Sequence, residues 1–96
     1  MFVVRDVFQA KYGRGNELVG LFKETFPKLG QDHTYRLLTD ASGPFFTVVT
    51  EIEVASLAEW EQMTANLFAM PEFGEWFNRM LPLVESGRRE FYRLES

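Results

Sequence analysis

The amino-acid sequence predicts an α+β fold in which helices pack on one face of an antiparallel sheet. Four segments alternate apolar and polar residues with the two-residue period of strands, and the segments between them place apolar residues at helical spacing. The longest alternating segment is Pro44–Val54. One of its faces is apolar and suits contact with helices, whereas the other changes from apolar to acidic along its length. We therefore expect this strand to organise the sheet.

Composition indicates one globular domain, residues 1–96, with a modest core. The chain holds ten Phe, three Tyr and two Trp, so aromatic rings fill the core or line a pocket or an interface. A net charge of −4 argues against a general nucleic-acid or anionic-membrane surface. The absence of cysteine excludes disulfides, thiolate nucleophiles and cysteine-based metal sites.

The N-terminal residues carry charge early, which bears on localisation. Arg5 and Asp6 interrupt the apolar start before it reaches the length of a signal-peptide core. No apolar run is long enough to cross a membrane. We expect a cytoplasmic protein.

The first strand is predicted at Phe2–Ala10, followed by a glycine-containing turn and a helix. Asn16 suits the helix N-cap, where its side chain can accept a hydrogen bond from the first turn. Pro27 is expected to end or kink this helix near Thr25 or Phe26, because proline has no amide hydrogen and disfavours helical backbone before it.

A connector is predicted at Gly30–Asp32, and the second strand at His33–Asp40. A short turn then leads into the third strand, Pro44–Val54. Two strands joined by so short a turn must be antiparallel, so they are expected to form a hairpin.

The next segment begins with a capping box. Ser56 and Glu59 have the spacing at which hydroxyl and carboxylate each satisfy an exposed amide of the helix start. The helix is expected to end at Met70, before Pro71, which can itself begin another helix. Pro82 ends that second helix.

The last strand is predicted at Arg88–Leu94, with Gly87 breaking the chain before it. The element order is then βαββα(α)β, the ferredoxin-like arrangement with one extra helix before the last strand.

The uncovered face of this sheet has apolar residues whichever way the strands face. The first strand offers either Phe2, Val4 and Phe8 or Val3 and Val7, and the third offers Phe45 and Val49 beside Glu51. A large exposed apolar patch on a small domain usually marks an interface. We therefore predict a homodimer in which two open sheet faces pack together as a dimeric α/β barrel. Charged strand residues are expected to pair within or across the sheets: Arg5, Arg36, Glu51, Glu53, Arg89 and Arg93.

Two stretches resemble a known superfamily. Val7–Glu24 resembles the strand, Lys-x-Gly turn and helix that open the dimeric α/β-barrel proteins, which include NIPSNAP-like and antibiotic-biosynthesis-monooxygenase-like groups. Ser56–Leu94 is similar to the NIPSNAP-like end, with a Trp-bearing helix, a short aromatic helix and a basic closing strand. The resemblance implies the barrel fold, and it leaves the activity open because the superfamily hosts several activities.

What the resemblance implies about a site is a polar pocket of Asn, Trp, Tyr and Arg that holds an aromatic or quinone-like molecule. The residue types that match are taken as catalytic candidates: His33, Tyr35, Asn66 and Arg89. The rings expected to line a substrate pocket are Trp60, Trp76, Phe46 and Tyr92. Both tryptophans also lie on apolar helical stripes, so an ordinary core role is the competing interpretation.

Three further side chains offer chemistry at the sheet. Arg36, like Arg89, can bind a carboxylate or enolate. A buried Asp6 or Glu51 can act as a base if its strand face is dry.

Cofactors and metals are not expected. One histidine excludes a His-rich metal site, and no phosphate-binding loop is present. Heme degradation, which the superfamily also hosts, is the least supported activity, because His33 is not on the second helix and Asp6 stands where an Asn is expected.

Two hypotheses of function remain. The first is a small-molecule-binding homodimer acting as a cofactor-independent monooxygenase on an aromatic or polyketide-like compound. The second is a non-catalytic dimeric module that binds a partner or metabolite without transforming it.

Overall fold

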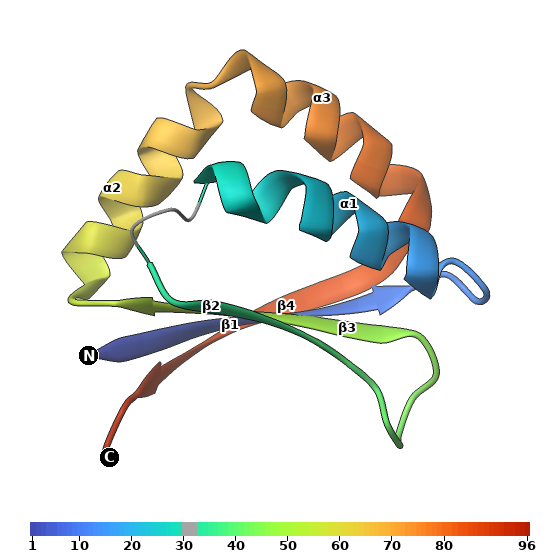
Figure 1. Ribbon diagram of the computed structural model, residues 1–96, viewed down its shortest axis with the longest axis horizontal. Helices are drawn as coiled ribbons and strands as arrows, with labels where there is room; N and C mark the ends of the chain where they lie inside the picture. Colours follow the sequence, from blue (N-terminus) through green and yellow to red (C-terminus); the bar gives the residue numbers. More distant parts are fainter. Residues whose placement is uncertain (30–32) are drawn as a thin grey trace.

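The structure is a computed structural model that describes residues 1–29 and 33–96. Helices cover one face of a twisted antiparallel sheet, whose strand order is β2-β3-β1-β4 (Figure 1). The elements are β1 (Phe2–Ala10), α1 (Gly15–Leu29), β2 (Tyr35–Thr39), β3 (Thr47–Val54), α2 (Leu57–Phe68), α3 (Pro71–Met80), the short 3₁₀ helix η1 (Leu81–Leu83) and β4 (Val84–Arg93). The predicted α+β, ferredoxin-like fold is confirmed.

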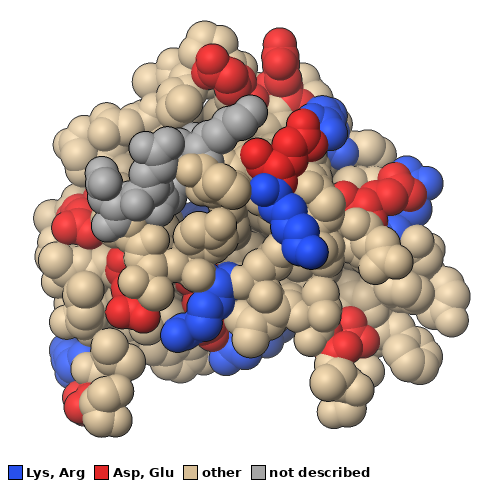
Figure 2. All heavy atoms as spheres, viewed as in Figure 1, with Lys and Arg blue, Asp and Glu red and all other residues tan. Residues whose placement is uncertain are grey.

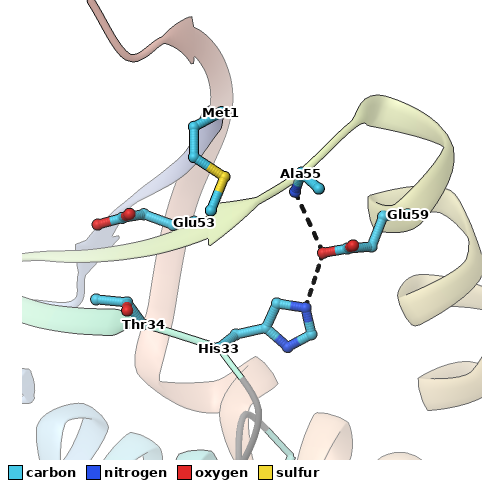
Figure 3. A pocket seen from close by; sticks show the side chains of 6 residues that line it. All are labelled: Met1, His33, Thr34, Glu53, Ala55 and Glu59. Carbon is cyan, nitrogen blue, oxygen red and sulfur yellow. Dashed lines mark hydrogen bonds and ion pairs between the residues drawn. The ribbon is translucent and has the colours of Figure 1, made fainter. Parts of the chain in front are cut away.

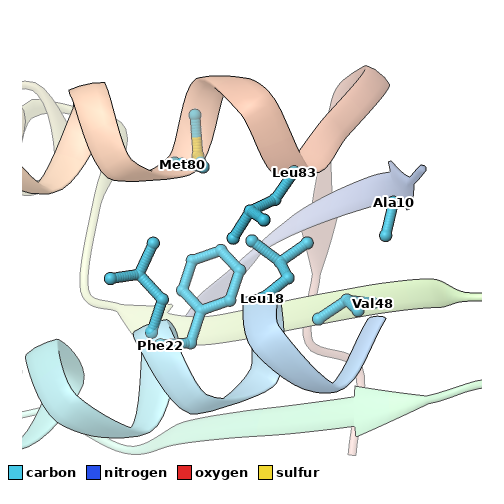
Figure 4. Packing of buried hydrophobic residues seen from close by; sticks show 7 residues of the cluster. Ala10, Leu18, Phe22, Val48, Met80 and Leu83 are labelled. Carbon is cyan, nitrogen blue, oxygen red and sulfur yellow. The ribbon is translucent and has the colours of Figure 1, made fainter. Parts of the chain in front are cut away.

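The core lies at one half of the sheet, between α1, the α3–η1 segment and the strands. Phe22 and Leu18 project from α1 toward Met80 and Leu83 (Figure 4). The remaining members of this buried cluster are Ala10, Leu21 and Val48. Burial of a large apolar side chain contributes about 1.5–3 kcal/mol, so this cluster is a major source of the packing energy.

The other half of the helix layer is less tightly packed. No residue of α2 is buried, although its sequence has an apolar stripe. Leu57 and Phe68, at the two ends of α2, are both exposed. Helix α2 is therefore attached to the sheet by a few side chains rather than by a continuous core.

Strand register decides which residues face the helices. Phe8 of β1 packs near the core and is paired with Val48 of β3, so even-numbered β1 residues face the helices. The opposite, open face of the two central strands carries the apolar side chains Val3, Val7 and Val49. The prediction that this face is partly apolar is confirmed.

The start and end of α1 differ from prediction. Asn16 lies inside the helix, which begins at Gly15, so it is not the N-cap. Pro27 lies within α1 and does not end it near Thr25 or Phe26. Pro27 is exposed and close to the helix terminus, where the carbonyl deprived of an amide donor can be hydrated. The predicted connector Gly30–Asp32 falls outside the described residues.

The hairpin strands are shorter than predicted. β2 covers Tyr35–Thr39, and β3 begins at Thr47, three residues after the predicted start at Pro44. The reason is Phe46, whose φ of 61° is left-handed and incompatible with a strand. Such a conformation costs about 1–3 kcal/mol at a residue with a side chain, so surrounding contacts must stabilise it.

β4 begins at Val84, four residues earlier than the predicted Arg88. Gly87 does not break the chain but lies inside the strand, opposite Phe8. A Cβ at Gly87 would lie 3.4 Å from the Phe8 ring, so the glycine leaves room for that ring.

The N-terminal caps of the helices after β3 agree with the predicted capping box except for one hydrogen bond. Ser56 caps α2 by accepting a hydrogen bond from the Glu59 amide at 3.1 Å. The Glu59 carboxylate accepts from the Ala55 amide at 3.3 Å instead of from the amide of Ser56. Helix α2 ends at Phe68, two residues before the predicted Met70, and Pro71 begins α3 as predicted.

Candidate functional site

A row of polar side chains crosses the helix-facing side of the sheet. Thr50 of β3 pairs with Asp6 of β1, and Asp6 pairs with Arg89 of β4. The rows on either side are mostly apolar: Ile52, Val4 and Phe91 on one side, and Val48, Phe8 and Gly87 on the other. We call Thr50, Asp6 and Arg89 the polar row. An apolar row in this place would serve packing alone, so the polar row is the first candidate for a functional role.

Arg89 is held in a fixed orientation by two partners. Its Nε donates to Asp6 Oδ1 at 2.7 Å, and its Nη2 donates to Asp6 Oδ2 at 3.1 Å. Its guanidinium lies 4.8 Å from the centroid of the Trp60 ring, within the range of a cation–π interaction. The Arg89 side chain remains 46 % exposed. A guanidinium that is oriented and still accessible can bind an anionic oxygen with little further ordering.

Trp60 supplies an aromatic wall beside this arginine. Its ring meets the Phe91 ring edge-on, with centroids 5.1 Å apart and planes at 87°. Trp60 comes from α2, whereas Phe91 comes from β4. The site therefore joins an aromatic surface to a cation, an arrangement that suits a flat ligand with a carboxylate or an enolate.

His33 lies in a pocket of about 510 Å³ at the opposite edge of the sheet. Its Nε2 is 2.9 Å from Glu59 Oε1, and the two side chains point toward each other (Figure 3). The hydrogen bond from His33, followed by that from the Ala55 amide, lowers the pKa of the Glu59 carboxyl. The pocket is also lined by Met1, Thr34 and Glu53. A carboxylate-oriented imidazole can transfer a proton, and here it also joins the start of α2 to the chain before β2.

The other predicted site residues lie in separate places. Tyr35 packs edge-on against Phe26, with centroids 5.2 Å apart. Asn66 is exposed on α2, where its side chain accepts from Gln62 at 3.0 Å. Neither residue lies in the polar row.

Two of the predicted pocket rings belong to the core half. Trp76 packs against Phe22 with centroids 5.4 Å apart. Its Nε1 is buried and has no hydrogen-bond acceptor among residues 1–29 and 33–96. Phe46 packs against the core from the turn before β3. These positions favour a structural role for both rings.

Tyr92 faces the open side of the sheet, opposite to the polar row. Its hydroxyl donates to Glu90 Oε1 at 2.9 Å, and this bond raises the pKa of Tyr92. Arg88 donates to the other Glu90 oxygen at 2.9 Å and lowers the pKa of that carboxyl. Tyr92 therefore does not share a site with Trp60.

Charged residues of the open face pair within one sheet. Glu51 Oε1 accepts from Arg36 Nε at 3.0 Å, and Glu51 Oε2 lies 3.5 Å from Arg5 Nε. Glu53 lies 3.9 Å from Arg36 Nη1. Glu51 is thus an ion-pair partner, and its position beside two arginines argues against the predicted role as a base.

Sequence reasoning identified part of the candidate site. Asp6 and Arg89 of the polar row and the neighbouring Trp60 were predicted as separate candidates, and the structure brings them together. Thr50 of the polar row, Phe91 beside Trp60 and Glu59 beside His33 were not predicted as site residues. Phe91 follows Arg89 by two residues in a strand, a spacing that places both side chains on one face, so its contribution was accessible from the alternation.

The described part of the chain was compared with three other kinds of functional feature: a metal site, a membrane-spanning helix and a surface patch of one charge sign. Among residues 1–29 and 33–96, no group of three His, Asp or Glu side chains is arranged to hold a metal ion. None of the described helices is long and apolar enough to cross a membrane. Acidic and basic side chains are interspersed on the face shown in Figure 2, rather than separated into patches of one sign.

The fold closely matches solved structures. An uncharacterized NIPSNAP domain protein from Burkholderia xenovorans superimposes with a TM-score of 0.90 at 18 % identity, over 100 % of this chain and 96 % of that one. A NIPSNAP family protein from Agrobacterium tumefaciens gives a TM-score of 0.83 at 20 % identity, over 96 % and 90 % of the two chains. An antibiotic biosynthesis monooxygenase gives 0.75 at 16 % identity, over the whole of both chains.

Comparison of the sequence without the structure finds no match. No family model matches the chain, and no curated protein matches it. The structural matches confirm the ferredoxin-like fold of the single chain. At these identities they show the fold only, so activity has to be argued from the residues of this chain.

Proposed function

We propose that the protein is a homodimer that binds an aromatic or polyketide-like molecule bearing an anionic oxygen. The ligand site in this proposal is the polar row with Trp60 and Phe91. The observation that carries it is the Arg89 guanidinium, which is oriented by Asp6, stacked on Trp60 and still accessible.

The dimer is supported by the open face of the sheet. Val3, Val7 and Val49 form an apolar centre on the two middle strands, and ion-paired arginines and glutamates surround it. An apolar centre with a polar rim is typical of protein interfaces. Packing of two such faces in a two-fold dimer makes the same patch contact itself, so a mixture of both charge signs is required.

The ligand class follows from the chemistry of the row. Trp60 and Phe91 offer ring surfaces, which favour a flat apolar molecule. Arg89 donates from Nε and Nη2 to Asp6, and its third nitrogen, Nη1, can donate to a ligand oxygen. Because Asp6 partly neutralises Arg89, a delocalised anion such as an enolate or phenolate suits the site better than a dianionic phosphate.

Two outcomes are possible once such a molecule is bound. If the protein is a cofactor-independent monooxygenase, an anthrone-like substrate loses a proton to the protein, and its carbanion reacts with dioxygen. The ring methylene becomes a carbonyl, and water is released. Asp6 is the carboxylate in the row that can accept the proton. If no such reaction occurs, the protein is a binding module. The ion pair with Arg89 favours this second outcome, because both oxygens of the Asp6 carboxylate already accept hydrogen bonds from Arg89.

Binding is tested by calorimetry with alizarin, a dihydroxyanthraquinone that cannot undergo this oxidation. We expect measurable binding by the wild type and a Kd at least about tenfold weaker in Arg89→Gln, because a hydrogen bond to a charged group contributes about 1.5–3 kcal/mol. Arg14→Gln is the matched control. Arg14 is also ion-paired, to Glu17 at 3.3 Å, but it lies on the turn before α1.

The results separate the parts of the proposal. Equal weakening in both arginine variants, or none in Arg89→Gln, contradicts the assignment of the site. Oxygen uptake with dithranol, a dihydroxyanthrone, distinguishes the two activities. Uptake by the wild type that is lost in Asp6→Asn supports the monooxygenase. Binding of alizarin without uptake of oxygen supports the module.

A further inference from the structure

We propose that in the homodimer Phe45 of each copy inserts into a pocket on the open sheet face of its partner, so that each interface site is completed by the other chain. This inference rests on the proposed dimer and adds its geometry. The occupant is a second copy of this chain, and the two ends of the open face supply the complementary parts.

The first part is an aromatic projection at the turn between β2 and β3. Phe45 is 68 % exposed, and Tyr12 beside it is also exposed. The two rings stand edge-on with centroids 6.4 Å apart. In Figure 1 the turn bends away from the helices, toward the open side of the sheet. Most of the Phe45 ring is therefore available for contact with another chain.

Contacts with neighbouring residues stabilise the conformation of this turn. Phe46 has the left-handed φ of 61° and turns its ring to the core, with its edge facing Tyr12 at 4.9 Å between centroids. The Gln9 side chain donates to the Phe45 carbonyl at 2.5 Å and accepts from the Thr47 hydroxyl at 3.3 Å. A strained residue that the surroundings maintain often serves a function. Here its consequence is that Phe46 points inward and Phe45 outward.

The second part is a pocket of about 430 Å³ at the opposite end of the open face. Its exposed apolar surface comes from Tyr92 and from Leu94 of the C-terminal tail, over the buried Val3. Arg5 and Arg36 also line it, each ion-paired to Glu51. The tail also bends away from the helices in Figure 1. Apolar surface next to guanidinium groups suits a phenyl ring, which gains both burial and cation–π attraction.

The symmetry of a dimer decides whether the two parts meet. A two-fold axis parallel to the strands would bring turn against turn and tail against tail. An axis across the strands instead places the turn of each copy on the tail end of the other, twice over. Only the second arrangement seats a projecting ring in a pocket, so we infer that axis.

Cysteine cross-linking tests the arrangement, because the chain has no cysteine of its own. We would make Phe45→Cys, Leu94→Cys and the double variant, and oxidise each. Within one chain the two positions lie near opposite ends of β1, about 30 Å apart, which is too far for a disulfide. We expect a covalent dimer from the double variant alone. A covalent dimer from either single variant would join like ends and overturn the proposal.

Sedimentation equilibrium separates failure of this inference from failure of the dimer itself. A monomeric wild type contradicts the proposed dimer, and with it this inference. A dimeric wild type whose double variant does not cross-link contradicts the inference alone. We also expect Phe45→Ala to weaken the dimer Kd about tenfold or more. Phe68→Ala is the control, since Phe68 is 61 % exposed on the helix layer, and it should leave that Kd unchanged.

Discussion

Glu59 and Trp60, neighbours in α2, attach this helix to opposite edges of the sheet. Glu59 Oε1 is hydrogen-bonded to His33 Nε2 at 2.9 Å, and His33 lies two residues before the start of β2. The Trp60 ring contacts Phe91 on β4 and lies under the Arg89 guanidinium. Since β2 and β4 are the two edge strands, one helical turn bridges the full width of the sheet. The position of α2 over the polar row therefore depends on two adjacent side chains.

The His33–Glu59 contact makes stability depend on pH. The pKa of Glu59 is lowered in the folded protein, so the unfolded chain binds the proton more readily. The contribution is fully present above the ordinary carboxyl value of 4.5 and is lost as the pH falls through the folded value. We expect Glu59→Gln to lower the Tm at pH 7, and we expect this difference to shrink as the pH falls below 4.5. Thermal unfolding of the wild type and of Glu59→Gln, from pH 7 to below pH 4.5, measures this difference in Tm. A Tm difference that persists at low pH would contradict the assignment.

Removal of the Trp60 ring should loosen α2 more than the rest of the molecule. Trp60 is partly buried, so Trp60→Ala is expected to cost about 1–2 kcal/mol, below the 3–5 kcal/mol typical of a fully buried ring. Hydrogen exchange of amides in α2 should accelerate, whereas amides in α1 keep their protection. Phe22→Ala is the comparison, because Phe22 is buried in the core and its loss should accelerate exchange throughout. Uniform acceleration in Trp60→Ala would show that α2 is not separately attached.

Gln9 should stabilise the strained turn before β3. Its side chain bonds to the Phe45 carbonyl and to the Thr47 hydroxyl. Gln9→Ala removes both bonds, and we expect a loss of about 1–2 kcal/mol in the free energy of unfolding. Denaturant unfolding measures the loss. Gln62→Ala on α2, where the Gln62 amide donates to exposed Asn66, is the control with an expected change below about 0.5 kcal/mol. Equal effects at both sites would argue that the turn needs no support from Gln9.

The strands and helices were predictable wherever local chemistry decided them. The alternation of Phe2–Ala10 gave the observed bounds of β1, and Ser56 marked the start of α2. The exceptions depend on contacts distant in sequence. Gly87 lies within β4 because it faces the Phe8 ring, a relationship that only the register of β1 against β4 creates. The left-handed Phe46 is likewise stabilised by Gln9, from another strand.

The candidate site was predictable as residue types but not as an assembly. Arg89, Trp60 and Asp6 were each predicted, yet nothing in their separation along the chain pairs them. Strand register brings Asp6 opposite Arg89, and the packing of α2 on the sheet brings Trp60 against the Arg89 guanidinium. The partner of His33 was missed for the same reason, since Glu59 was accounted for as a helix-capping residue.

The central claim is the homodimer, because the open sheet face and the inserted Phe45 both depend on it. Native mass spectrometry of the purified protein tests it most directly. We predict a main species at twice the chain mass of 11.2 kDa, with any retained ligand visible as additional mass. A species at the single-chain mass at micromolar concentration would contradict the claim, since the open face of the sheet would then have no partner.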